Sequence, residues 1–268
     1  MKTKIEKTVT GGFTNEYFRF GKGKTPLVIL PGVSVQSVML FADAIEEAYA
    51  PLADGFDIYV LDRRKELPKK YDVYGMAKDT AEVFDALGIK NACVFGASQG
   101  GMIALVLALT RPDLVGKLAL GSTCARISGE TKAKIDVWAK AAEEKDAEKL
   151  FFEFGRLVYP KEVFEASKDA LSAAAKAATP EELSRFAVFV RAMDGFDVSQ
   201  SLGSLSCPVL LLASSDDGVF GKEDFELMKN GLKEIRGFAF HLYDSYGHAA
   251  YDLAPDYKER LLRFFKEQ

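Results

Sequence analysis

The 268-residue chain has little cysteine, little histidine and no long hydrophobic run. Its three cysteines, Cys93, Cys124 and Cys207, show no C-x-x-C spacing, so neither a disulfide framework nor a cysteine-based metal site is expected. Cys93 and Cys207 adjoin apolar runs and are expected to be buried. Two histidines are too few for a His-rich zinc site. No segment approaches the roughly 18 apolar residues of a membrane-spanning helix, so no membrane partner is expected. The small number of cysteines and histidines means that no metal is expected either.

Signals for charged partners and cofactors are equally sparse. The net charge is −4 without a basic or acidic tail, so nucleic acid is not an expected partner. Residues 1–6 lack an apolar signal core, and we expect a cytoplasmic protein. Residues 31–34 follow an early strand without G-x-G-x-x-G, so no dinucleotide cofactor is predicted. A basic cluster at 63–65 and 69–70 is expected to form a solvated loop.

What the chain does have is a globular composition, 48% hydrophobic with 20 phenylalanines, at a length that suits one α/β domain. Short apolar runs alternate with segments of helical periodicity. The expected strands cover residues 13–20, 27–30, 57–61, 92–95, 115–120, 208–213 and 238–243. The expected helices cover residues 36–52, 74–87, 99–110, 222–232 and 253–265. This order predicts an α/β fold with a mostly parallel central sheet and helices on both faces.

The alternation stops between about residues 126 and 200. This stretch is rich in Ala, Lys, Glu and Phe and poor in strand signals, which indicates several helices. We expect a helical cap at 126–200, inserted in a core domain formed by 1–125 and 201–268. The aromatic residues of the insertion either line an apolar substrate site or hold the cap together. They are Phe151, Phe152, Phe154, Tyr159, Phe164, Phe186 and Phe189.

The most specific motif is Gly96-Ala97-Ser98-Gln99-Gly100, which lies between a predicted strand and a predicted helix. A sharp strand-to-helix turn exposes the side chain at its apex. It also aims the N–H groups of the helix start at whatever that side chain attacks. Gly96 and Gly100 must be small, because a Cβ there would clash in the strained turn. Ser98 is therefore a candidate nucleophile; the alternative is a glycine-rich turn with an incidental serine.

A serine hydroxyl needs a base within hydrogen-bond reach. His248 lies in a loop after the last predicted strand, where it can turn toward Ser98. His241 lies inside that strand and is expected to be structural. The base needs an acid that holds its tautomer, and Asp216 and Asp217 follow the preceding strand. Two adjacent side chains cannot both face the histidine, so one is expected to be a solvated turn residue.

Four segments together resemble the α/β-hydrolase fold superfamily over nearly the whole chain. They are Leu30-Pro31-Gly32-Val33, the turn at Ser98, Pro208 to Asp217, and Gly247-His248. The order serine, acid, histidine along the chain is typical of this family. The resemblance selects Asp217 over Asp216 as the acid, because the family often has Gly-x-x-Asp after this strand. It also implies an oxyanion hole formed by the backbone N–H groups of Val33 and Gln99.

Three positions depart from the family pattern. Pro31-Gly32 stands where many relatives have His-Gly, a change that leaves the backbone donors intact. Residues 64–66 interrupt the Arg-Gly-x-Gly that often follows the equivalent of Asp62-Arg63, which puts the shape of this loop in doubt. Ser214 replaces the glycine of Gly-x-x-Asp.

The resemblance implies a capped serine hydrolase, in the group of esterases, haloperoxidase-like perhydrolases and carbon–carbon bond hydrolases. We expect a carboxylic ester hydrolase that cleaves a small ester or related carbonyl substrate with an apolar part, through an acyl-enzyme on Ser98 and without a cofactor. One alternative is a carbon–carbon bond hydrolase or lyase that uses the same triad on a dicarbonyl metabolite; another is a ligand-binding member. Arg126, Arg156 and Arg191 are candidates to bind a substrate carboxylate. The oligomeric state is left open.

Overall fold

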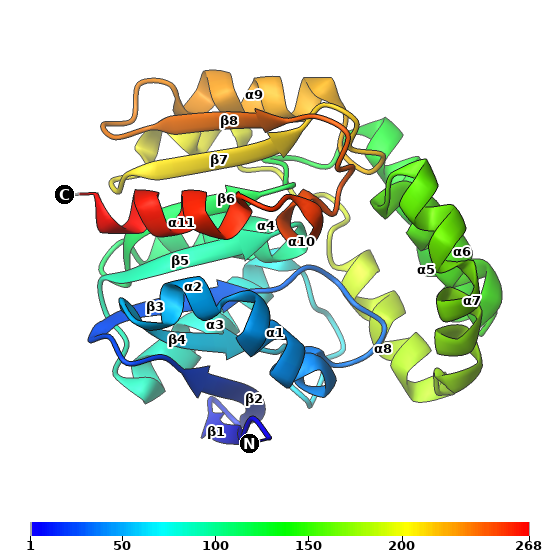
Figure 1. Cartoon of the computed structure of the whole chain (residues 1–268). Helices are drawn as coiled ribbons and strands as arrows, with labels where there is room; N and C mark the ends of the chain where they lie inside the picture. Colours follow the sequence, from blue (N-terminus) through cyan, green and yellow to red (C-terminus); the bar gives the residue numbers. More distant parts are fainter. Residues whose placement is uncertain (1, 268) are drawn as a thin grey trace.

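An eight-stranded sheet runs through the protein, whose structure, a computed structural model, describes residues 2–267 (Figure 1). The strand order is β1-β2-β4-β3-β5-β6-β7-β8, and only β2 runs against its neighbours. The strands are β1 (Ile5–Thr10), β2 (Phe13–Phe20), β3 (Thr25–Leu30), β4 (Phe56–Leu61), β5 (Ala92–Ala97), β6 (Val115–Gly121), β7 (Val209–Ser214) and β8 (Ala239–Tyr243). The mostly parallel sheet is confirmed. The sequence did not predict β1. This strand lies at the edge of the sheet, and its Val9 is 73% exposed, so little apolar alternation marks it in the sequence.

Helices cover both faces of this sheet, as predicted. The core helices are α1 (Ala42–Ala48), α2 (Ala50–Ala53), α3 (Val73–Leu87), α4 (Gln99–Thr110), α9 (Lys222–Leu232), α10 (Ala250–Leu253) and α11 (Tyr257–Lys266), with the 3-10 helix η1 (Val38–Phe41). Apolar side chains of α3, α4 and α9 form one hydrophobic core with the sheet. Those of α1, α2 and α11 form a second core on the opposite face, in front of the sheet in Figure 1. The parallel strands are therefore buried on both sides.

Two helices expected to be continuous are interrupted. Residues 36–52 form η1, α1 and α2, and residues 253–265 contain only the end of α10 and most of α11. Pro51 lies in the first turn of α2, and Pro255 lies between α10 and α11. Proline lacks the N–H that a helix interior requires, and it is tolerated in the first turn. Each proline therefore marks a break that helical periodicity alone does not reveal.

Four helices and one 3-10 helix stand between β6 and β7. They are α5 (Gly129–Glu143), α6 (Ala147–Val158), α7 (Lys161–Ala177), α8 (Pro180–Arg191) and η2 (Ser199–Ser204). In Figure 1, α5 to α8 lie beyond the carboxyl ends of the strands, where they face the loops of the sheet. Thr179 and Glu182 form a capping box that begins α8. The division into a core and a cap at 126 and 200 remains our proposal.

Two further findings concern the cysteines and the helix lengths. Cys93 and Cys207 are buried and free, as expected. Within residues 2–267, no helix combines the length and apolar character needed to cross a bilayer. The cytoplasmic location stays a prediction.

Candidate active site

Ser98 stands at the apex of the turn between β5 and α4, with φ 52° and ψ −122°. A non-glycine residue rarely has a positive φ, and strain of about 1–3 kcal/mol persists only where packing enforces it. A Cβ on Gly100 would lie 1.9 Å from the carbonyl oxygen of Leu30, and one on Gly96 would lie 2.5 Å from that of Gly100. Backbone crowding therefore requires the glycines of this motif, as the sequence indicated.

The loop after β3 passes beside this turn. A Cβ on Gly32 would lie 3.8 Å from Ser98 Oγ, which places the backbone near Val33 close to the hydroxyl. Among the described residues, neither the N–H of Val33 nor that of Gln99 donates to a protein acceptor. Unpaired backbone N–H groups beside a nucleophile are suited to bind an oxyanion. Val33 and Gln99 therefore remain the candidate donors.

Asp217 and His248, from the loops after β7 and β8, form a buried pair. His248 Nδ1 lies 2.9 Å from Asp217 Oδ2 and 3.0 Å from Oδ1, and each side chain is 4% exposed. Asp217 Oδ1 also accepts the backbone N–H groups of Val219 and Phe220, at 2.8 and 2.9 Å. These donors hold the carboxylate and stabilise its charge. The carboxylate in turn orients the imidazole and leaves Nε2 for another partner.

Asp216 turns away from the imidazole, as adjacent side chains must. Its carboxylate accepts the Ser214 hydroxyl at 2.7 Å and the backbone N–H of Gly247 at 3.1 Å. Asp216 is an exposed turn residue, as expected of one of the two acids, and it also anchors the loop that carries His248. The hydroxyl at Ser214, where relatives often have glycine, takes part in this anchor.

Ser98 and His248 both lie in loops at the carboxyl edge of the sheet and are 8% and 3% exposed. Within residues 2–267, no hydrogen bond joins them. Contacts between a nucleophile and its base are often long without substrate and shorten when it binds. Their pairing remains a prediction. His241 lies in β8, with its ring against Tyr243 at 4.5 Å between centroids, which fits the structural role expected for it.

The expectation of a solvated basic loop is wrong for Arg64, whose side chain is 16% exposed and pairs with Asp79, and for Arg63. Arg63 Nη2 donates to the carbonyl oxygen of Pro31 at 2.7 Å and to Gln99 Oε1 at 3.2 Å. Burial lowers the pKa of this guanidinium. Lys65 and residues 69–70 are exposed, as expected. Arg63 differs because it follows β4 almost directly and so emerges at the carboxyl edge of the sheet, beneath the inserted helices.

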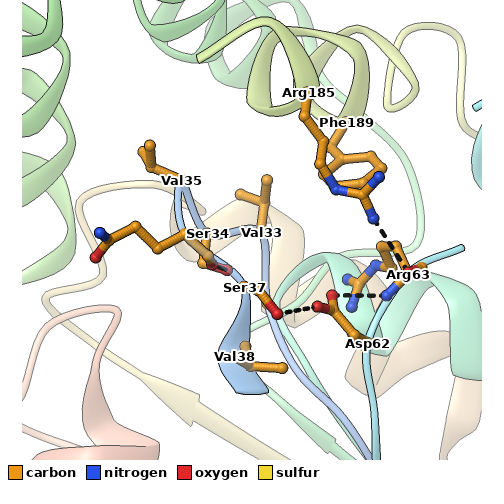
Figure 2. Close-up of a pocket in the computed structure, with 11 residues that line it drawn as sticks. Val33, Ser34, Val35, Ser37, Val38, Asp62, Arg63, Arg185 and Phe189 are labelled. Atoms are coloured by element: carbon orange, nitrogen blue, oxygen red, sulfur yellow. Dashed lines mark hydrogen bonds between the residues drawn. The ribbon is translucent and has the colours of Figure 1, made fainter. Parts of the chain in front are cut away.

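Figure 2 shows the side chains that brace this region. Asp62 accepts the backbone N–H of Arg63 at 2.7 Å, and Arg185 of α8 donates to the carbonyl oxygen of Arg63 at 3.1 Å. The Gln99 amide donates to the carbonyl oxygen of Phe189, also in α8, at 2.6 Å. Helix α8 is thereby tied to Gln99 and, through Arg63, to the loop that contains Val33.

A cavity of about 390 Å³ lies beside Ser98, between the inserted helices and the rest of the protein. Gly32, Val33 and Ala97, which flank the serine turn, contribute to its wall. Much of the remaining wall is aromatic, with Phe41, Tyr49, Phe95, Phe154, Tyr159 and Tyr251. One carboxylate, that of Asp252, also lines it. This volume suits a small organic molecule with an apolar part.

A family model described as the alpha/beta hydrolase fold matches residues 25–255. The chain belongs to this family. The matched span begins at β3 and ends beyond α10, so it includes Ser98, Asp217 and His248. The resemblance carried by the sequence motifs is therefore confirmed at the level of family and fold.

Relatives within this hydrolase family carry different activities in their names. RutD of Azorhizobium caulinodans, for which carbamate hydrolysis is the proposed activity, is 29% identical over 199 residues, which is 72% of each chain. The 2-hydroxy-6-oxo-6-phenylhexa-2,4-dienoate hydrolase of Comamonas testosteroni is 24% identical and covers 99% of this chain and 96% of its own. MGS-M2, an enzyme from a deep-sea metagenome, has a TM-score of 0.87 at 18% identity, with 98% of each chain covered. The last likeness shows the fold alone.

Three arginines considered for binding a substrate carboxylate do not line the cavity of this α/β-hydrolase chain. Arg191 and Arg156 form ion pairs with carboxylates of α5 and α6, and Arg126 is exposed. Within residues 2–267, no group of three His, Cys, Asp or Glu side chains is placed to hold a metal ion.

The aromatic residues of the insertion divide between both expected roles. Phe154 and Tyr159 line the cavity, whereas Phe186 and Phe189 are buried. Sequence reasoning missed Tyr251 and Asp252 as cavity residues. The sequence held one indication of them, which is their position. They follow His248 by three and four residues and so stay near the end of the sheet that carries the site.

Proposed function

We propose that the protein is a serine hydrolase that cleaves a small ester or a carbamate, with Ser98 as nucleophile, His248 as base and Asp217 as the acid. The observation that carries the proposal is the buried contact of 2.9 Å between Asp217 and His248, at the edge of the sheet where Ser98 occupies a strained turn. The names of relatives add weight to an acyl-transfer reaction at a carbonyl carbon.

In the first half-reaction, His248 Nε2 takes the proton of the Ser98 hydroxyl while Oγ attacks the carbonyl carbon. The carbonyl oxygen becomes an oxyanion, which the N–H groups of Val33 and Gln99 stabilise. The intermediate collapses, the bond to the leaving group breaks, and the imidazolium gives its proton to the departing oxygen or nitrogen. An acyl group remains on Ser98.

In the second half-reaction, His248 takes a proton from water, and the resulting hydroxide attacks the acyl carbon. The bond to Ser98 Oγ then breaks, and the imidazolium returns a proton to it. The product is a carboxylic acid from an ester, or a carbamic acid from a carbamate. Asp217 keeps its charge throughout; it holds the proton on Nδ1, so that Nε2 stays the basic nitrogen.

A carbon–carbon bond hydrolase is the second candidate, because the Comamonas testosteroni relative spans nearly the whole chain. The wall of the cavity weighs against it. A dienoate carries a carboxylate, yet the charged side chain of the wall is the carboxylate of Asp252, and none of the three candidate arginines reaches the cavity. A ligand-binding protein is a weaker candidate, since binding alone does not require a buried acid–histidine pair.

The test is covalent labelling with a fluorophosphonate probe, followed by mapping of the adduct by mass spectrometry. We expect modification of Ser98, and loss of the label in Ser98→Ala and in His248→Ala. Labelling of another residue, or labelling of Ser98 that does not depend on His248, would contradict the proposal. Turnover of matched esters, carbamates and dicarbonyl compounds then separates the two enzymatic candidates.

A further inference from the structure

Asp252 is a carboxylate on the wall of the cavity without a protein partner. It lies in α10, four residues after His248. Within residues 2–267, no side chain or backbone group donates a hydrogen bond to its carboxylate, and no ion pair within 4 Å includes it. Asp252 is exposed, and it lines the cavity.

An unpaired carboxylate in a largely aromatic cavity wall is available to a ligand. The cation that acts on it is that of Lys258, which donates to the carbonyl oxygen of Tyr251 and lies against the rings of Tyr49 and Tyr257. Burial raises the pKa of Asp252, and the positive charge of Lys258 offsets this rise only in part. The charge of the carboxylate is therefore only partly balanced by Lys258, and the carboxylate lines the cavity.

The same cavity extends to neighbours of the proposed nucleophile. Its wall includes Val33 and Ala97, which flank the serine turn, together with Asp252. A substrate whose carbonyl group lies at Ser98 therefore occupies a space that Asp252 also faces. Tyr159 and Tyr251 line this space as well, and aromatic rings attract cations through their electron-rich faces.

We propose that Asp252 is a specificity residue that binds a protonated amine or a quaternary ammonium group of the substrate. The proposal rests on the proposed function, since it places this group on the same molecule whose carbonyl carbon Ser98 attacks. A carboxylate beside aromatic rings suits a cation, because the carboxylate supplies the opposite charge and the rings supply dispersion contacts. The same carboxylate repels an anionic substrate, and a neutral apolar one leaves it unpaired.

The experiment compares two esters of one shape. The 2-(trimethylammonio)ethyl ester of a short acid carries a positive nitrogen, and the 3,3-dimethylbutyl ester has a neutral carbon in its place. We expect the wild-type protein to favour the cationic ester by roughly tenfold or more in kcat/KM, the effect of one desolvated charge contact. Asp252→Asn keeps the side-chain shape and is expected to bring the ratio close to one, mainly by raising KM for the cationic ester.

Glu259→Gln is the matched control, because Glu259 is exposed on α11 and its loss changes the net charge equally. This variant is expected to keep the wild-type ratio. A ratio near one in the wild-type protein, or an unchanged ratio in Asp252→Asn, would overturn the assignment.

A binding measurement separates this proposal from the proposed function. Calorimetry with choline, an unreactive cation, needs no chemistry at Ser98. Choline binding that weakens about tenfold in Asp252→Asn supports the cation site even if the fluorophosphonate fails to label Ser98. If the probe labels Ser98 but choline does not bind, or binds independently of Asp252, the cation site is ruled out. The proposed serine hydrolase is then still supported.

Discussion

Asp216 and Asp217 are neighbours in the chain, yet their carboxylates hold different parts of the His248 loop. Asp217 contacts the imidazole Nδ1 at 2.9 Å, and Asp216 accepts the backbone N–H of Gly247 at 3.1 Å. One acid thus orients the ring, and the other positions the backbone that carries it.

The two acids therefore predict different mutational effects. Asp217→Asn no longer secures the tautomer that makes Nε2 basic, and we expect kcat to fall by roughly 10⁴-fold. Asp216→Asn weakens a charge-assisted bond to Gly247, with an expected loss of about 1–3 kcal/mol in unfolding free energy and a smaller loss of kcat. Steady-state kinetics and urea unfolding of both variants check this. A larger loss of kcat in Asp216→Asn would move the catalytic acid to that residue.

Arg63 offers a second prediction, because it bridges the carbonyl of Pro31 and the side chain of Gln99. Arg63→Met should let both candidate oxyanion donors shift. We expect kcat to fall by up to about 10²-fold, as small displacements in an active site can cause, with little change in KM.

Arg64→Met is the control for Arg63, since Arg64 lies on the same loop but pairs with Asp79 at 3.1 Å, away from the turn at Ser98. Equal losses of kcat in the two variants would mean that Arg63 acts only through the general shape of the loop.

The glycines of the turn at Ser98 predict a stability difference. Gly100→Ala places a Cβ 1.9 Å from the carbonyl oxygen of Leu30, and overpacking against a fixed backbone should cost about 3 kcal/mol or more. Gly129→Ala, in open space at the start of α5, should be neutral or stabilising by about 0.4–1 kcal/mol. Urea unfolding of both variants measures the contrast, and similar stabilities would rule out the crowding described for the turn.

Asp252 predicts a stability effect that depends on pH. Burial raises the pKa of its carboxyl group, and Lys258 and His248 oppose this shift. Such a group binds its proton more tightly in the folded state, so its contribution to stability falls as pH rises from the unfolded pKa, about 3.9, through the folded one. Asp252→Asn should be more stable than wild type at pH 7, with a difference that shrinks below about pH 4. Melting temperatures across this range test it, and a difference independent of pH would contradict the raised pKa of Asp252.

Elements with a strong local pattern could be predicted closely from the sequence. Helices α4 and α9 have the expected bounds of 99–110 and 222–232, and α3 ends at Gly88 in the left-handed conformation expected of a cap. Elements whose pattern is weak or interrupted could not, as β1 and the segment 36–52 show. An exposed edge strand buries too little apolar surface to mark its face, and a proline within the first turn of a short helix leaves the surrounding periodicity intact.

The sequence by itself determined the family, the order of strands and helices, and the candidate residues Ser98, Asp217 and His248, because short motifs between periodic segments carry that information locally. Only the tertiary structure decided that Asp216 anchors the His248 loop, that Arg63 contacts Gln99, and that Asp252 lines a cavity. These outcomes depend on contacts between residues 30 or more positions apart, such as Asp216 with Gly247 and Arg63 with Gln99. Packing brings such residues together, and no local pattern records it.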